Sequence, residues 1–224
     1  MLVPVFLIGG GDVTQGIVER YENNVDFTDY AAYGKYEIPV LWPEKWEPVT
    51  FVPFHEAKRV KKAEGTGIHF FVHDFLFQRL WTHREMYLPM LQRFDAVMTP
   101  DFSLYTDWPM VIQLYNHYRK HLLGAWLQRE GVKVYPTIGW SDETSYDWCF
   151  DGEPMGGTVC VSSVGTQKSK ETKRLFLRGY EAMLERLMPE TIVFFGSVPA
   201  ECKGNIVQME PYYKKIEERK RKDD

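Results

Sequence analysis

The sequence contains little cysteine and no long apolar stretch. Its three cysteines, Cys149, Cys160 and Cys202, form no C-x-x-C pair, which disfavours both a disulfide scaffold and a zinc ribbon. Free thiols are typical of a reducing cytoplasm, where we expect the protein to act. Crossing a bilayer takes roughly 20 consecutive apolar residues, and no segment reaches that length. Residues 1–11 also lack the charged start and the cleavage site of a signal peptide.

An excess of positive charge is also missing. The chain has 27 Lys and Arg against 31 Asp and Glu, a net charge of −4. It therefore has no global field that gathers nucleic acid, although a local basic groove stays open, with a small basic run at 58–62. The denser basic run at 214–222 contains two glutamates, and we interpret it as a solvated terminal helix.

Several common catalytic motifs are absent. No serine lies in a G-x-S-x-G elbow and no cysteine has a convincing histidine partner, which disfavours a nucleophilic triad. Gly9-Gly-Gly11 lacks the P-loop lysine and the spaced glycines of a dinucleotide-binding loop. His117 and His121 have the i, i+4 spacing of a helical zinc pair, but the glutamate of the metalloprotease pattern does not follow. We interpret both as packing or surface histidines, with a metal pair as the alternative.

What the chain does contain is a series of short apolar runs that end in polar residues. Continuous apolar strands separated by helices indicate a buried, mostly parallel sheet. Apolar residues three or four apart predict two long helices, 109–130 and 171–188, with Asp107 as the cap of the first and Pro189 as the stop of the second. The predicted strands are 38–42, 49–54, 68–72, 96–99, 132–138, 158–161, 191–195 and 206–209, and 3–8 is a further candidate.

The alternation of strands and helices predicts the α/β class in a single domain, 1–224. About eight strands suggest a compact, irregular (β/α) barrel-like domain, and a doubly wound open sheet is the alternative. Residues 1–36 are expected to form an irregular N-terminal segment and residues 214–224 a charged tail. Trp42 and Val49 are too close for the crossover helix that parallel neighbours need. We therefore expect an irregular or antiparallel start.

In both architectures the loops after the carboxyl ends of the strands build the ligand site. These positions are rich in carboxylates and hydroxyls in this chain. Carboxylates that lie close together at this end of the sheet repel each other. Their presence there therefore indicates acid/base catalysis, cation binding or recognition of polar groups. The candidates are His73, Asp74, Asp101, Ser103, Trp140, Ser141, Asp142, Glu143, Ser162, Ser163, Ser197 and Glu210.

Asp101 is the sharpest candidate, because it follows a strand directly and Pro100 fixes the backbone before it. We expect it to serve as an acid/base carboxylate together with Asp142 or Glu143, and its alternative role is to cap amides of its own loop. His73 beside Asp74 is a second acid/base or metal-ligand candidate. A metal requirement stays open, with a divalent cation as the candidate cofactor.

Two further expectations concern ligand binding at this rim, the end of the sheet formed by the loops after the strands. Trp140 follows a strand, where it either stacks on a sugar ring or base or packs in the core with its N–H satisfied. Ser162 and Ser163 precede the basic residue Lys168 and a predicted helix, and such a small-residue loop can hold an anion.

Four strings coincide with these strand ends and resemble a known family. They are Phe70-Phe-Val-His-Asp-Phe75, Thr99-Pro-Asp-Phe-Ser-Leu-Tyr-Thr-Asp-Trp-Pro109, Pro136-Thr-Ile-Gly-Trp-Ser-Asp-Glu143 and Cys149-Phe-Asp-Gly152. The chain resembles domain-of-unknown-function family 4417 of bacteria, phages and plasmids, from about Ile38 to Ser197. The resemblance implies a cytoplasmic protein encoded by a phage or mobile element. It implies no activity, so it transfers no catalytic residue.

Three functions are compatible with the sequence. The first is a carboxylate-dependent enzyme that cleaves a nucleotide, glycoside or nucleic-acid-related substrate at the rim. The second is a binding protein without catalysis, which sequesters a host nucleotide signal or inhibits a host protein. The third is an accessory factor in DNA replication or nicking, which the acidic net charge disfavours.

Overall fold

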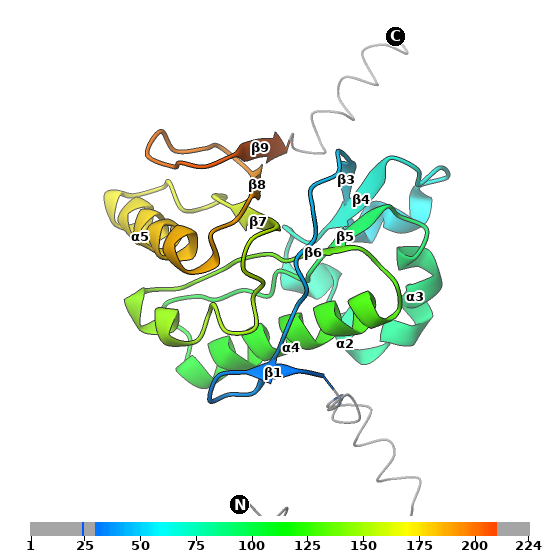
Figure 1. Ribbon diagram of the computed structural model, residues 1–224, viewed down its shortest axis with the longest axis horizontal. Helices are drawn as coiled ribbons and strands as arrows, with labels where there is room; N and C mark the ends of the chain where they lie inside the picture. The colour runs from blue at the N-terminus through cyan, green and yellow to red at the C-terminus, as the bar shows by residue number, and fades with distance from the viewer. Residues whose placement is uncertain (1–23, 25–29, 210–224) are drawn as a thin grey trace, which may run out of the picture.

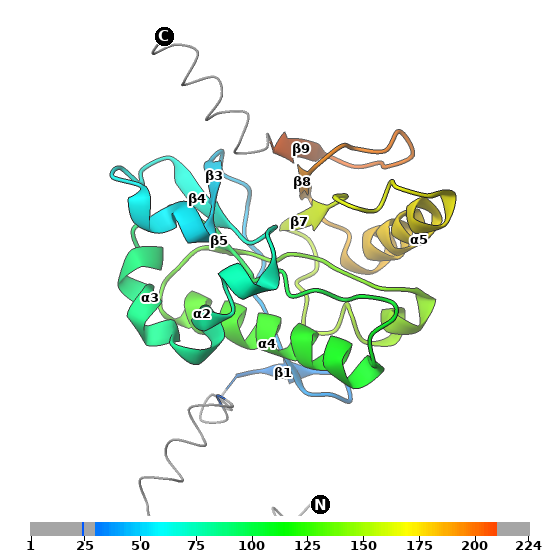
Figure 2. The ribbon, with the colours of Figure 1, turned by 180° about the vertical axis from the view of Figure 1, so that it is seen from behind.

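The protein folds as a mixed α/β structure with two parallel sheets (Figure 1, Figure 2). The structure, a computed structural model, describes residue 24 and residues 30–209. One sheet has four strands in the order β3-β4-β5-β6, and the other has three in the order β7-β8-β9. The bounds are Thr50–Pro53 for β3, Thr66–His69 for β4, Ala96–Met98 for β5, Val134–Tyr135 for β6, Thr158–Ser162 for β7, Thr191–Phe195 for β8 and Ile206–Met209 for β9.

A short stretch of backbone pairing joins the two sheets. Thr137, just beyond β6, forms a parallel bridge with Cys160 of β7, and the Cys160 amide donates to the Pro136 carbonyl at 2.8 Å. The seven strands therefore follow one another in chain order, every pair of neighbours parallel. This order has no reversal of the kind that defines a doubly wound sheet.

The combined sheet is strongly curled. Four strand spacings separate β4 from β8, about 19 Å in a flat sheet at about 4.8 Å per strand. Nevertheless, Phe71, just after β4, stacks on Phe195 at the end of β8 with ring centroids 5.2 Å apart.

The predicted α/β class and the predicted parallel strands are confirmed. The sequence also suggested a barrel-like domain, but within 30–209 no strand pairing closes the sheet into a barrel.

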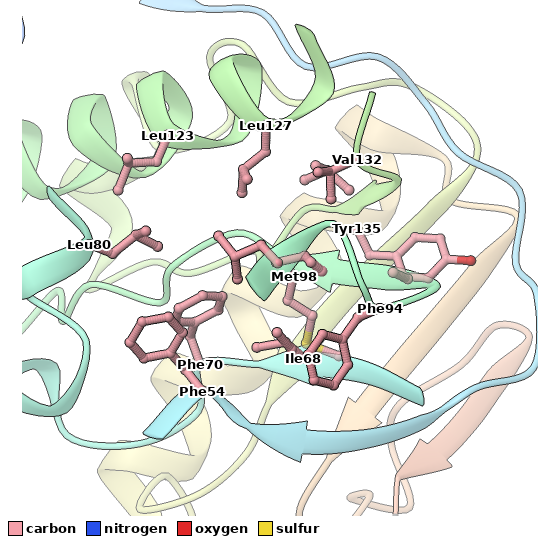
Figure 3. Close-up of a cluster of buried hydrophobic side chains, with 14 of the residues drawn as sticks. Phe54, Ile68, Phe70, Leu80, Phe94, Met98, Leu123, Leu127, Val132 and Tyr135 are labelled. Atoms are coloured by element: carbon pink, nitrogen blue, oxygen red, sulfur yellow. The ribbon is translucent and has the colours of Figure 1, made fainter. Parts of the chain in front are cut away.

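The helices cover the outer faces of the two sheets (Figure 1, Figure 2). Helices α2 (Arg79–Thr82), α3 (Arg84–Leu91) and α4 (Met110–Arg129) lie against the first sheet, and α5 (Lys170–Leu187) lies against the second. Figure 3 shows Leu123 and Leu127 of α4 directed at the side chains of the first sheet, where Ile68 and Met98 are fully buried. Apolar burial of this kind supplies most of the stability of such layers.

A short hairpin covers α4 on the side away from the sheet (Figure 1). It consists of β1 (Ala32–Tyr33) and β2 (Ile38–Pro39), which pair antiparallel. An irregular or antiparallel start was expected between the strands near Trp42 and Val49, but the antiparallel partner of β2 is β1 and not β3. Because α4 lies between this hairpin and the sheet, even its polar residues are buried, among them His117, Lys120 and His121.

Local sequence signals predicted the ends of the two long helices, α4 and α5, with one exception. The backbone of Gly131 has φ +78°, the left-handed conformation in which glycine ends a helix, and it follows Glu130, the C-cap residue of α4. Asp107 was expected to cap α4, but the N-cap residue is Pro109 and no side chain caps this helix. That expectation was wrong because the helix begins at Met110, beyond the reach of a carboxylate that must bond to the second or third helical amide. Three short 3-10 helices, η1 (Phe54–Arg59), η2 (Asp74–Leu76) and η3 (Glu143–Asp147), complete the connections.

Candidate functional site

Asp101 lies at the carboxyl end of β5, where the sequence placed it. Thr99 anchors the strand end, since its hydroxyl accepts from the Thr137 amide at 2.8 Å and lies 2.9 Å from the Thr137 hydroxyl. Pro100 then turns the chain, and Asp101 follows, partly shielded from solvent. Among the described residues, none donates a hydrogen bond to its carboxylate. The rim therefore presents one carboxyl group that local capping does not use.

The surroundings of Asp101 raise the pKa of its carboxyl group to about 7. The largest cause is desolvation, because the carboxylate form loses hydration at this position. The Asp74 carboxylate raises the pKa further, and the Lys120 ammonium lowers it. A carboxyl group with a pKa near 7 can both donate and accept a proton at neutral pH, as general acid/base catalysis requires.

Asp74 is the second carboxylate of this site, on η2 after β4. Its two oxygens accept hydrogen bonds from Ser103, one from the amide at 3.1 Å and one from the hydroxyl at 2.8 Å. Asn116 of α4 in turn donates to the Ser103 carbonyl at 2.7 Å. The loops after β4 and β5 and the helix α4 are thereby tied together, so Asp74 is held in one orientation beside the Asp101 segment.

Aromatic rings line the same end of the strands. His73 and Phe75 stack with ring centroids 5.9 Å apart, and the Phe75 side chain is 71% exposed. His69 of β4 is buried beneath the Phe71 and Phe195 pair, 5.2 Å from the Phe195 ring. Burial lowers the pKa of His69 to about 3, so its imidazole is neutral. Exposed aromatic faces beside two carboxylates can bind the ring of a base or a sugar.

The loop after β6 turns away from Asp101 and toward α5. Trp140 packs against the hydrophobic core between α5 and the second sheet, 5.5 Å from the Phe176 ring. A Cβ added to Gly179 would lie only 2.1 Å from the Nε1 atom of Trp140. Asp142 caps η3 by accepting from the amide and hydroxyl of Thr144. The exposed Glu143 pairs with Arg178 and Arg174. These residues are engaged in local packing, capping and ion pairs.

The predicted anion-binding residues are also engaged locally. The Ser162 hydroxyl accepts from the Val164 amide at 3.2 Å, and the buried Ser163 hydroxyl donates to the Ser197 carbonyl at 2.7 Å. Helix α5 begins only at Lys170, where Ser169 and Thr172 form a capping box. The first amides of α5 are thus partly satisfied by its own residues. Lys168 is exposed.

The other predicted residues and segments either have local partners or lie outside the described residues. Ser141 is buried and its amide donates to the Ser145 hydroxyl at 3.2 Å. In the basic run at 58–62, Arg59 pairs with Glu56 and Lys58 lies over the Tyr87 ring. Glu210, the candidate strand 3–8, the glycines 9–11 and the basic tail 214–224 lie outside the described residues.

Sequence reasoning missed a buried polar cluster beside α4. Glu153 Oε1 accepts from Lys120 Nζ at 2.5 Å and lies 3.0 Å from His121 Nε2, with all three side chains almost fully buried. His117, one turn earlier on α4, is buried as well. The i, i+4 histidine spacing and the string that ends at Gly152, just before Glu153, were the available signals. The contact itself spans more than 30 residues of chain, so local patterns could not reveal it.

The fold and the site define a parallel α/β protein with a carboxylate-bearing rim at the ends of its strands. The chain belongs to the family described as Domain of unknown function (DUF4417), whose model matches residues 30–213. It is 37% identical over 165 residues to the Gene 1 protein of Mycobacterium phage L5, covering 73% of this chain and 72% of that protein. It is 35% identical over 179 residues to the Gene 1 protein of Mycobacterium phage D29, covering 79% of this chain and 66% of that protein.

The family assignment confirms the resemblance drawn from the sequence strings. No solved structure matches the chain. Within the described part of the chain, every helix is too short or too polar to span a bilayer.

Proposed function

We propose that this chain is a carboxylate-dependent hydrolase, which cleaves a nucleotide, glycoside or nucleic-acid-related substrate at the carboxyl ends of its parallel strands. The observation that carries the proposal is the Asp101 carboxyl group, whose pKa of about 7 comes from burial at the rim. Groups with strongly raised pKa values concentrate at catalytic sites, because holding them costs stability. The phage relatives favour action inside an infected bacterial cell.

In this reaction Asp101 is the general acid. It donates its proton to the leaving-group oxygen as the bond between that oxygen and the substrate centre breaks. A water molecule attacks the same centre and gives its proton to the other carboxylate, which we assign to Asp74. Ser103 orients Asp74 for this task through two hydrogen bonds. The exposed face of Phe75, stacked on His73, is available for a base or a sugar ring.

This assignment changes the partner that the sequence suggested for Asp101. Asp142 and Glu143 were the expected partners, but Asp142 caps η3 and Glu143 pairs with arginines of α5. Asp74 instead lies close enough to Asp101 for its charge to raise the pKa of that carboxyl group. We therefore place Asp142 and Glu143 outside the reaction.

The test is hydrolysis of a substrate panel by the full chain and by Asp101→Asn. The panel contains nucleoside mono-, di- and triphosphates, dinucleotides and aryl glycosides, each with and without Mg²⁺. For any substrate that is turned over, Asp101→Asn should lower kcat by about 10²–10⁴-fold, the usual contribution of a positioned acid or base. Activity should also fall as the pH rises through about 7, because Asp101 then loses the proton that it donates.

Asp107→Asn is the matched control, since Asp107 is an exposed carboxylate six residues further along the same loop. Its kcat should equal that of the parent chain. Equal kcat for the parent chain and Asp101→Asn would contradict the proposal. So would a panel nucleotide that binds tightly and returns intact after the protein is denatured, which identifies a binding protein instead.

A further inference from the structure

The buried cluster beside α4 contains two histidines and a carboxylate from separate parts of the chain. His117 and His121 lie one turn apart on α4, and Glu153 comes from the loop after η3. One ligand atom from each lies within 4.8 Å of those of the other two. All three residues are buried, with the side chains of His121 and Glu153 at 0% exposure. The proposed hydrolase site uses none of them.

The hydrogen bonds of the two histidines fix which ring nitrogens carry protons. His117 Nε2 lies 3.0 Å from the Asp151 carbonyl oxygen, and His121 Nδ1 lies 2.8 Å from the Pro39 carbonyl oxygen. A carbonyl only accepts, so both of these nitrogens donate. His117 Nδ1, the opposite nitrogen of the neutral His117 ring, then has a free lone pair. His121 Nε2 faces Glu153 Oε1 at 3.0 Å and becomes available as a ligand when that contact is given up. Metal-bound histidines are oriented in this way, with the second N–H given to a backbone carbonyl.

Two atoms of the cluster have no partner at all. Neither His117 Nδ1 nor Glu153 Oε2 forms a hydrogen bond in the described part of the chain, although both are buried. Burying a polar atom without a hydrogen-bond partner is destabilising, so two such atoms in one cluster point to a bound ligand. Lys120 and His121 already use Glu153 Oε1, which leaves Oε2 as the open acceptor. Two lone-pair donors without partners are what a cation requires.

We propose that His117, His121 and Glu153 bind a divalent transition-metal ion such as Zn²⁺ in the interior of the protein. Two imidazoles and one carboxylate form a common zinc ligand set. Around a tetrahedral ion the ligand atoms lie about 3.3 Å apart, so small side-chain rotations bring the three atoms to that spacing. The ion joins α4 to the loop after η3, and it replaces the contact between His121 Nε2 and Glu153.

The surrounding backbone is packed closely around this cluster. Gly152 has φ +75°, and a Cβ there would lie 2.6 Å from the Pro39 oxygen and 2.9 Å from His121 Nδ1. Glycine at this position therefore lets the loop after η3 and the β1–β2 hairpin both reach His121. The Leu41 amide donates to the Gly152 carbonyl at 2.9 Å, which fixes the loop against the hairpin. The three ligands thus lie on two segments, α4 and the loop after η3, and the β1–β2 hairpin holds both in place.

Metal content and thermal stability test the proposal on the full chain without a histidine tag. Protein purified from zinc-supplemented cells should contain about one zinc per chain, and His117→Asn should reduce this to below about a tenth. Removing the metal with a chelator should lower the melting temperature, and Zn²⁺ should restore it in the parent chain but not in His117→Asn. His55→Asn, which removes an exposed histidine, should behave like the parent chain.

Cobalt substitution makes the test independent of the stability of a variant. Co²⁺ added to the metal-free parent chain should produce visible absorption bands typical of low-coordinate nitrogen and oxygen ligands. The proposal is overturned by substoichiometric metal in the folded parent chain together with no thermal shift and no visible bands on adding Zn²⁺ or Co²⁺. That result would assign the two unpaired atoms to a buried water that donates to both.

Discussion

Replacing Lys120 by methionine should lower the free energy of unfolding by about 3–5 kcal/mol, the usual cost of removing one partner of a buried ion pair. Lys120 Nζ donates to Glu153 at 2.5 Å and to the Thr137 carbonyl at 2.8 Å, in surroundings where the Glu153 side chain has no exposure. Lys120→Met leaves that carboxylate without its nearest cation, and water cannot replace the lost interaction. Urea unfolding at pH 7, with a chelator in every sample, measures the change.

Two comparisons separate burial from charge in this experiment. Lys133→Met removes a surface cation that pairs with Glu47 at 2.6 Å, and it should cost less than about 1 kcal/mol. Combining Lys120→Met with Glu153→Leu removes both buried charges, and the double variant should regain a large part of the stability lost by the single one. If Lys120→Met lowers the free energy of unfolding no more than Lys133→Met does, the buried Glu153 carboxylate does not need Lys120 for its stabilisation.

Asp101→Asn should make the protein more stable at pH 8 than the parent chain, by about 1–3 kcal/mol. The pKa of Asp101 is about 7 in the folded protein, against 3.8 for the unperturbed group. Between these two values the unfolded chain has lost the proton while the folded chain keeps it, so the stability of the parent chain falls as the pH rises from about 4 to about 7. Asparagine does not titrate. The full shift would correspond to more energy, but the partial exposure of Asp101 reduces the expected gain.

The pH dependence of the difference is the decisive feature. The gain from Asp101→Asn should be largest at pH 8 and should approach zero near pH 4, as measured by thermal unfolding of both proteins across that range. Asp107→Asn, at an exposed carboxylate, should show no such trend. A constant difference between Asp101→Asn and the parent chain would mean that Asp101 titrates equally in the folded and unfolded states.

Most of the strands could be predicted from the sequence, because each is a continuous apolar run with a polar residue at its end. The predicted runs 191–195 and 206–209 coincide with β8 and β9. The curling of the sheet could not be predicted in the same way. It depends on contacts such as that between Phe71 and Phe195, which are distant in the sequence.

In the candidate site too, local sequence predicted some residues, and contacts between distant parts of the chain decided the rest. Asp101 could be placed at the rim because its position follows from a strand end and a proline. The roles of Asp142 and Glu143 could not be separated from the sequence, since Glu143 pairs with Arg178, 35 residues further along the chain. Glu153 was missed for the same reason, as its partners Lys120 and His121 lie on α4. Local patterns predict which residues face a strand end, and long-range packing decides which of them remain free.

The most direct test of the proposed hydrolase site is an NMR titration of the Asp101 side-chain carboxyl carbon in the metal-free full chain. The resonance is assigned by its absence in Asp101→Asn, and its chemical shift is followed from pH 3 to pH 9. A pKa of about 7 is predicted, with burial as the main cause. A pKa near the unperturbed value of 3.8 would contradict the assignment of Asp101 as the general acid.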